Sequence, residues 1–315
     1  MKEVATAPEI SNVKAAILGF QHLLAMYSGD VLVPLLIGAA LHFTTEQLTY
    51  LVSIDIFMCG IATFLQLKRT PLTGIGLPVV LGCAVQAVNP LIQIGKTYGL
   101  GTMYGSIIGA GIFIFLIAGL FSRIKNLFPP VVTGSLITII GFTLIPVAFQ
   151  NLGGGDATAK DFGNLPSLGI GFLTIAIILL ISVFAKGFMK SVSILIGILA
   201  GTLVAGAMGM VSLKPVMEAS WFHLPTLFYF GTPHFEWSSI LTMILVSLTT
   251  MVESTGVFFA LGDITGRKIE GDDLKRGYRA EGIAVILGGL FNTFPYSTFS
   301  ENVGVVQLSG VKTRK

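Results

Sequence analysis

The sequence predicts an all-α polytopic membrane protein. Of its 315 residues, 53% are hydrophobic and only 11% are charged, and the mean hydropathy is +0.84. A soluble domain usually carries about 25% charged residues, so this chain has too few charges to cover a water-facing surface. Long apolar segments also recur along the whole chain, which is typical of a bundle of membrane-spanning helices.

A membrane-spanning helix needs roughly 20 mostly apolar residues, and ten segments approach this requirement. The strongest are 100–121, 167–185 and 191–212, which contain no charged residue. The third and tenth are the weakest because they are short and rich in Gly, Pro and polar residues. In chain order, the predicted spans are 13–39, 48–66, 76–92, 100–121, 129–149, 167–185, 191–212, 238–262, 280–294 and 298–311.

The distribution of basic residues predicts the orientation of these spans. Cytoplasmic loops of membrane proteins collect Lys and Arg. If the N-terminus is cytoplasmic, sixteen of the nineteen basic residues lie inside and only Lys96, Lys160 and Lys214 lie outside. This partition favours an even number of spans in the cytoplasmic membrane of the cell, with the N-terminus inside.

The composition argues against several other classes of protein. A net charge of +3 is not the strongly basic balance of a nucleic-acid-binding protein. The two cysteines, Cys59 and Cys83, lie in apolar runs and do not suggest a disulfide framework. The sequence contains no HExxH, GxSxG or phosphate-binding glycine loop. We therefore predict that the protein is not an enzyme and has neither a cofactor nor a metal site.

Ionisable residues inside apolar spans are costly and are candidates for function. Glu253 is the strongest, because it lies near the middle of the eighth span and an unpaired carboxylate there would cost several kcal/mol. The others also have structural interpretations. His22 could be a core histidine bonded to a carbonyl, Asp30 and Asp55 could be structural carboxylates facing a neighbouring helix, and Asp263 and Glu281 could form solvated salt bridges beside the basic loop between spans eight and nine. The full set is His22, Asp30, Asp55, Glu253, Asp263, Glu281 and Glu301.

Two spans have an irregular sequence at matching places in the two halves of the chain. The third contains Pro71, Gly74, Gly76 and Pro78 in TPLTGIGLPVVLG, and the tenth begins with Pro295 in FPYSTFSEN. Broken helices in corresponding halves indicate the binding site of a transporter, because irregular backbone at membrane depth is tolerated where it lines a cavity. Two proline-kinked structural helices are the alternative.

Four motifs make the chain resemble the nucleobase–ascorbate transporters. The signature-like segment SENVGVVQLSGVKTR runs from Ser300 to Arg314, and FQHLLAMYSG in the first span resembles the start of that family's first span. MVESTG and RAEG resemble its eighth-span and ninth-span motifs. The motifs occur in the family's order, and their details look most like bacterial xanthine permeases.

This resemblance implies fourteen spans in two inverted seven-span repeats, with a short strand in each of the broken spans three and ten. Residues 1–121 would form the first part of a core domain, 122–237 the first part of a gate domain, and 238–315 an incomplete second part of the core. Because about ten of the fourteen spans are present, we expect the chain to be a C-terminally truncated member.

The resemblance also implies a function and a site. The function would be proton-coupled uptake of a purine nucleobase, with xanthine favoured, by an elevator-like movement of core against gate. Substrate would contact Glu253, Glu301, Asn302, Gly304 and His22, and proton coupling would involve Glu253, Glu281 and His22. The expected partners are the nucleobase, protons, the lipid bilayer and a second copy of the chain in a homodimer.

Alternatives to xanthine transport remain open at the level of sequence. Glu301 stands where many purine-type relatives have Gln and resembles the uracil-type pattern, whereas Ala25–Tyr27 resembles the xanthine type. A uracil or uric acid permease is therefore an alternative within the family. A non-transporting remnant, or a channel for anions such as bicarbonate or sulfate, is an alternative of a different class.

Overall fold

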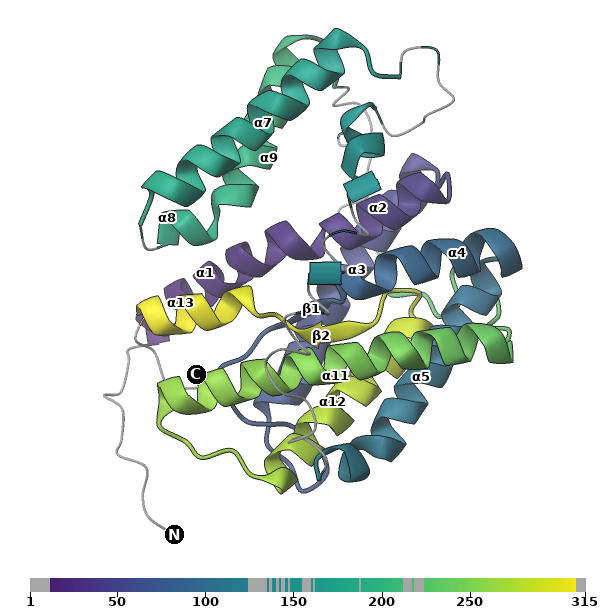
Figure 1. The fold of residues 1–315 in the computed structure, drawn as a ribbon, viewed down its shortest axis with the longest axis vertical. Helices are drawn as coiled ribbons and strands as arrows, with labels where there is room; N and C mark the ends of the chain where they lie inside the picture. The colour runs from purple at the N-terminus through teal and green to yellow at the C-terminus, as the bar shows by residue number, and fades with distance from the viewer. Residues whose placement is uncertain are drawn as a thin grey trace.

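In the computed structural model, the chain forms a mostly helical bundle with a two-stranded sheet at its centre (Figure 1). The residues described are 12–123, 162–186, 188–211 and 224–309, with isolated stretches between 135 and 160 and residue 217. The predicted span 129–149, the tail that contains Arg314, and the end of the signature segment lie largely or wholly outside these residues. Five helices are long and apolar enough to cross a membrane, as a polytopic membrane protein requires.

In the first part of the chain, the first, second and fourth predicted spans correspond to helices. The first span is divided at Val31 into α1 (Asn12–Asp30) and α2 (Leu32–Ala40), and the second is α3 (Thr45–Leu67). A capping box in which Thr44 and Gln47 bond each other's backbone N–H groups fixes the start of α3. The fourth span is α5 (Leu100–Phe121).

A second group of helices, α7 (Leu165–Phe184), α8 (Phe188–Ser191) and α9 (Ser193–Ala207), corresponds to spans six and seven. These helices pack on one another and lie to one side of the bundle, where they contact α1 and α13 (Figure 1). The predicted gate domain includes them, and its boundaries remain a prediction.

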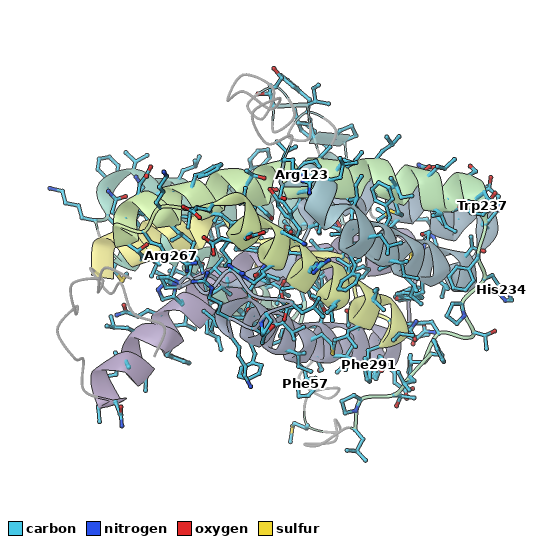
Figure 2. All side chains as sticks on the ribbon, turned by 90° about the horizontal axis from the view of Figure 1, so that it is seen from below. Phe57, Arg123, His234, Trp237, Arg267 and Phe291 are labelled. Atoms are coloured by element: carbon cyan, nitrogen blue, oxygen red, sulfur yellow. The ribbon has the colours of Figure 1, made fainter. Side chains whose placement is uncertain are left out.

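The eighth span is α11 (Trp237–Thr265), which crosses the molecule from Trp237 at one end to the neighbourhood of Arg267 at the other (Figure 2). The carboxylate of Glu236 caps its first turn by accepting the N–H groups of Ser238 and Ser239. These hydrogen bonds hold the pKa of Glu236 below its usual range, and the bond from Ser239 has the larger effect.

The predicted ninth span, 280–294, is wrong at its start. Helix α12 runs from Gly271 to Leu290, so the part of the supposed basic loop that carries Lys275 and Arg279 is helical. Glu270 and Asp273 form a capping box at its N-terminus, and ion pairs of Asp273 with Arg267 and Arg276 stabilise its charged first turn. Hydropathy alone does not detect a helix of this kind.

Both broken spans contain a strand, as the family resemblance implied. Strand β1 (Leu81–Cys83) is followed by the short 3-10 helix η1 (Val85–Ala87) and by α4 (Val88–Tyr98), and β2 (Tyr296–Thr298) is followed by α13 (Glu301–Ser309). The strands pair antiparallel, with Gly82 opposite Ser297. Gly74, with a φ of 90°, allows the turn before β1, because a Cβ there would lie 2.2 Å from the carbonyl oxygen of Lys68.

Helices α5 and α12 pack closely through glycines. A Cβ atom on Gly282 would lie 2.7 Å from the backbone nitrogen of Phe115, and one on Gly111 would lie 2.7 Å from that of Ile286. Small residues that let two backbones approach in this way are typical of contacts between membrane helices.

We expect Gly282→Ala to destabilise the protein by roughly 1–3 kcal/mol, because the added methyl group overpacks backbone that cannot move aside. Gly60→Ala on α3 is the matched control, since nothing lies within 4 Å of its Cβ position and Ala favours a helix by up to about 1 kcal/mol over Gly. Thermal unfolding in detergent measures both variants. Equal melting temperatures would contradict close packing at Gly282.

Candidate functional site

The two paired strands bring the first helical turns after each break together with α1, α11 and α12. Helix α4 follows β1, and α13 follows β2 beside α1 (Figure 1). The N-terminal N–H groups of such half-helices can bind polar or anionic groups. Three hydrogen-bonded groups of side chains lie in this region.

The first group joins Glu253 of α11 to Gln86 of η1. The side-chain amide of Gln86 donates a hydrogen bond to the Glu253 carboxylate, which is half-buried. Glu253 therefore meets the expectation that a carboxylate at this depth has a polar partner. Gln86 was absent from the predicted site, because it is uncharged and a search for ionisable residues passes over it. Its place in the first turn after a break was the available signal.

The second group joins α1 to α13. The side-chain nitrogen of Asn302, which is buried, donates to the backbone oxygen of His22 at 3.3 Å. The amide oxygen of Asn302 and Nδ1 of the His22 ring are also buried, and neither has a hydrogen-bond partner among the described residues. Buried polar atoms normally have partners, so these two atoms are candidates for contact with a ligand.

The third group surrounds Glu281 of α12, which is only 2% exposed. Its carboxylate accepts the hydroxyl of Thr298 at 2.7 Å. The Ser254 hydroxyl in turn accepts the backbone N–H of Thr298 at 3.3 Å. The interpretation of Glu281 as a solvated salt-bridge residue is therefore wrong, because the early start of α12 turns this side chain into the bundle. Asp263 is exposed.

The structure does not place the predicted site residues Glu301 and Gly304 in any of these three groups. Glu301 begins α13, but its side chain lies outside the part of the chain that the structure describes. Gly304 is exposed and has nothing within 4 Å of its Cβ position. Asp30 and Asp55 belong to a separate hydrogen-bonded cluster with Cys59 and Cys83.

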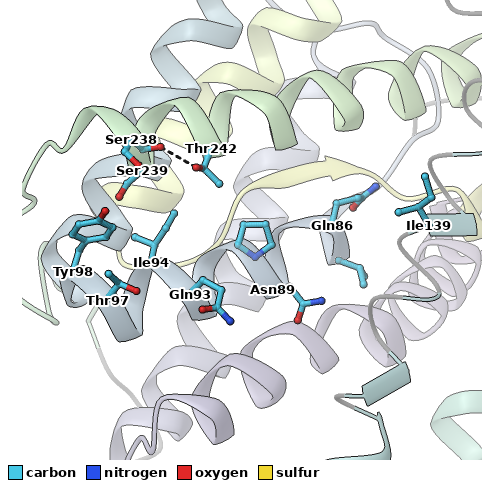
Figure 3. A pocket seen from close by; sticks show the side chains of 12 residues that line it. Gln86, Asn89, Gln93, Ile94, Thr97, Tyr98, Ile139, Ser238, Ser239 and Thr242 are labelled. Carbon is cyan, nitrogen blue, oxygen red and sulfur yellow. Dashed lines mark hydrogen bonds between the residues drawn. The ribbon is translucent and has the colours of Figure 1, made fainter.

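A cavity of about 570 Å³ begins at Gln86 and follows one face of α4 (Figure 3). Several polar side chains line it, because Asn89, Gln93 and Thr97 of α4 face Ser239 and Thr242 of α11 across it. The cavity touches the Gln86–Glu253 pair only through Gln86. It connects that pair with the end of α11 at which Trp237 lies.

The chain is similar to known proteins over almost its whole length. A family model described as a permease family matches residues 13–315. The chain is 56% identical to the uric acid permease PucK of Bacillus subtilis over 94% of its own length and 69% of that protein. It is likewise 56% identical to the xanthine permease of that organism, over 95% of the chain and 68% of the relative. It is 43% identical to the uric acid transporter UacT of Escherichia coli, over 97% and 64%.

Solved structures with the same inverted-repeat fold are similar in shape but not in sequence. The transmembrane domain of the cyanobacterial bicarbonate transporter BicA superposes with a TM-score of 0.62 at 13% identity, covering 97% of this chain and 80% of that one. SLC26A9 superposes with a TM-score of 0.54 at 14% identity, covering 96% and 55%. At these identities the likeness supports the fold and carries no information about the transported solute.

Proposed function

This chain belongs to the nucleobase–ascorbate transporter family, and from that membership we propose that it carries an oxidised purine base, xanthine or uric acid, across the cell membrane together with protons. Relatives named for both bases are each 56% identical to it. The observation that supports the proposal best is the Gln86–Glu253 pair, which places an amide and a carboxylate at the junction of the first break with α11.

The chemistry of this pair suits the edge of a purine. Xanthine and uric acid present N–H groups next to carbonyl groups around a planar ring. A carboxylate can accept two neighbouring N–H bonds, whereas an amide offers both a donor and an acceptor. In our proposal, Glu253 accepts from the ring and Gln86 turns from Glu253 toward a ring carbonyl. A base with the wrong edge would leave buried polar groups without partners, which is how such a site discriminates.

The remaining predicted residues have roles around this pair. We assign the ring-facing side of the pocket to Asn302 and His22, whose unpartnered atoms lie on α13 and α1. Glu301 and Gly304 complete the substrate contacts predicted from the signature. Glu281 shares the proton-coupling role with Glu253 and His22, because Thr298 links it to Ser254, the residue next to Glu253.

The path and the movement follow from the same geometry. The cavity along α4 serves as the route by which the base reaches Gln86. The broken segments move with α3, α5, α11 and α12 against α7–α9, so that the site faces each side in turn, as in other transporters with inverted repeats. A homodimer formed through the gate helices is part of the proposal.

Uptake measurements test this function. The chain is expressed in cells that lack their own uptake of these bases, and labelled xanthine, uric acid and uracil are offered with and without a proton gradient. We expect uptake of one or both oxidised purines, its loss when the gradient is collapsed, and little competition from uracil. Uptake of uracil alone would overturn the substrate assignment, and gradient-independent flux of bicarbonate or sulfate would favour the channel alternative.

A further inference from the structure

The structure contains a second cluster of buried acidic groups that the proposed transport site does not use. Asp30 at the end of α1 and Asp55 in α3 are both 0% exposed. Cys59 of α3 is 0% exposed and Cys83 of β1 is 1% exposed. One carboxylate oxygen of Asp30, one of Asp55 and the sulfur atom of Cys59 all lie within 4.8 Å of one another.

Every described donor to these carboxylates is uncharged. Asp30 accepts the backbone N–H of Cys83 at 2.6 Å and the thiol of Cys59 at 3.2 Å. Asp55 accepts the thiol of Cys83 at 3.0 Å and the hydroxyl of Tyr296 at 2.9 Å. Within the described part of the chain, neither aspartate has an ion pair with Lys, Arg or His. Two carboxylates ionised together here would repel each other in a medium of low dielectric constant.

The contact between the two carboxyl groups is itself informative. Carboxylate oxygens of Asp30 and Asp55 lie within 4.8 Å of each other. An ionised carboxylate has only acceptor oxygens, so two carboxyl groups can share a hydrogen bond only if one of them carries a proton. Pairs of carboxyl groups that hold one proton in common are known from catalytic dyads, where like charges cannot both ionise.

The end of β2 in the second repeat has a similar arrangement to the end of β1, which independently supports a role for the buried acids beside these strands. At the end of β1, the N–H of Cys83 donates to Asp30 of the first span, and at the end of β2, the N–H of Thr298 donates to Ser254 of the eighth span. The Cys83 thiol then donates to an acid of α3, as the Thr298 hydroxyl donates to Glu281 of α12. Each strand therefore ends against a buried acid on the neighbouring helix.

We propose that Asp30 and Asp55 form a proton-binding site that holds one shared proton and thereby keeps strand β1 against α1 and α3. The groups facing the pair are Cys59 from α3, Cys83 from β1 and Tyr296 from β2, with Tyr104 of α5 within electrostatic reach of Asp55. The Tyr104 hydroxyl is buried and has no hydrogen-bond partner among the described residues. Loss of the shared proton would place two negative charges behind β1 and loosen the strand that leads into Gln86. The site is separate from the proposed pocket and does not depend on the transported solute.

Infrared spectroscopy of the purified chain tests the proposal directly. The carbonyl stretch of a protonated carboxylic acid is separate from the bands of carboxylates, and labelling with carbon-13 at the aspartate side chain distinguishes Asp from Glu. At neutral pH we expect one isotope-shifted band of a protonated aspartic acid per molecule. We expect Asp30→Asn and Asp55→Asn each to lose the shared-proton band, and Cys83→Ala to keep the band at a shifted frequency.

Three outcomes would overturn the proposal. The first is wild-type protein without a protonated aspartate at neutral pH, a measurement that needs no variant to fold. The second is a band that persists unchanged in both Asn variants. The third is a band that appears only after treatment with a chelator or disappears when sodium or zinc ions are added, which would assign the pair to a metal cation instead.

Discussion

Replacing Glu253 with Gln is expected to abolish uptake of labelled purine while leaving the protein folded in the membrane. The substitution preserves the size of the side chain, and Gln86 can still donate to the amide oxygen. It removes the charge and one of the two acceptor oxygens with which Glu253 would bind neighbouring N–H groups of the base. A hydrogen bond to a charged group contributes roughly 1.5–3 kcal/mol, so weakening two of them removes about 3 kcal/mol or more, and we expect uptake to fall by about 100-fold or more.

The matched control is Glu236→Gln, which makes the same chemical change at the N-terminus of the same helix. Glu236 caps α11 through Ser238 and Ser239 and lies outside the proposed pocket, so uptake should persist. The uptake rate at a purine concentration well below saturation, normalised to the amount of protein in the membrane, measures both variants. Uptake by the Glu253→Gln variant at the rate of the control would show that the carboxylate is not needed to bind the base.

Gln86 also shows how much of this site could be predicted from the sequence. The positions of the breaks could be predicted, because Gly74, Pro78 and Pro295 interrupt apolar segments in matching halves. The presence of a short strand in each break followed from the family resemblance and is confirmed by the structure. The contact of Gln86 with Glu253 could not be predicted, because it depends on how two segments 167 residues apart approach each other in space.

The predicted start of the ninth span was wrong for a different physical reason. Hydropathy detects helices that bury apolar side chains, but the first turns of α12 are held by ion pairs and a capping box. The box residues Glu270 and Asp273 have the spacing of an N-terminal helix signal, which could have located the start. With that start, Glu281 falls on the buried face of the helix and no longer beside a loop.

A large effect on stability is expected at the end of α11 that lies opposite Trp237, where three arginines bind Asp273. One oxygen of its carboxylate accepts from Arg69, Arg267 and Arg276 at 2.8, 2.7 and 2.6 Å. The Asp273 side chain is only 8% exposed. Arg267 also donates to the backbone oxygens of Ile75 and Gly76 in the segment that leads into β1. Asp273 therefore holds together the elements that position the first break.

We expect Asp273→Asn to destabilise the protein by roughly 2–4 kcal/mol, because it leaves three clustered guanidinium groups without a countercharge. The exposure of Arg69, whose side chain is 44% exposed, keeps the loss below that of a fully buried cluster. Asp272→Asn is the control, since this neighbouring carboxylate is exposed. Thermal unfolding in detergent at neutral pH measures the difference. Equal melting temperatures for the two variants would contradict a central role for Asp273.

The pH dependence of stability separates the charge of Asp273 from its shape. Burial opposes ionisation, but the hydrogen bonds from Arg276 and from the backbone, with the charges of Arg267 and Arg69, outweigh it and lower the pKa of Asp273 below its usual 3.8. A carboxyl group whose pKa is lower in the folded state stabilises the protein above its unfolded pKa and loses this contribution as the pH falls through the folded value. The wild-type protein should therefore lose stability on acidification below about pH 4, the ordinary range for Asp. The Asp273→Asn variant should lose less over the same interval, and parallel curves for the two proteins would assign the acid sensitivity to another group.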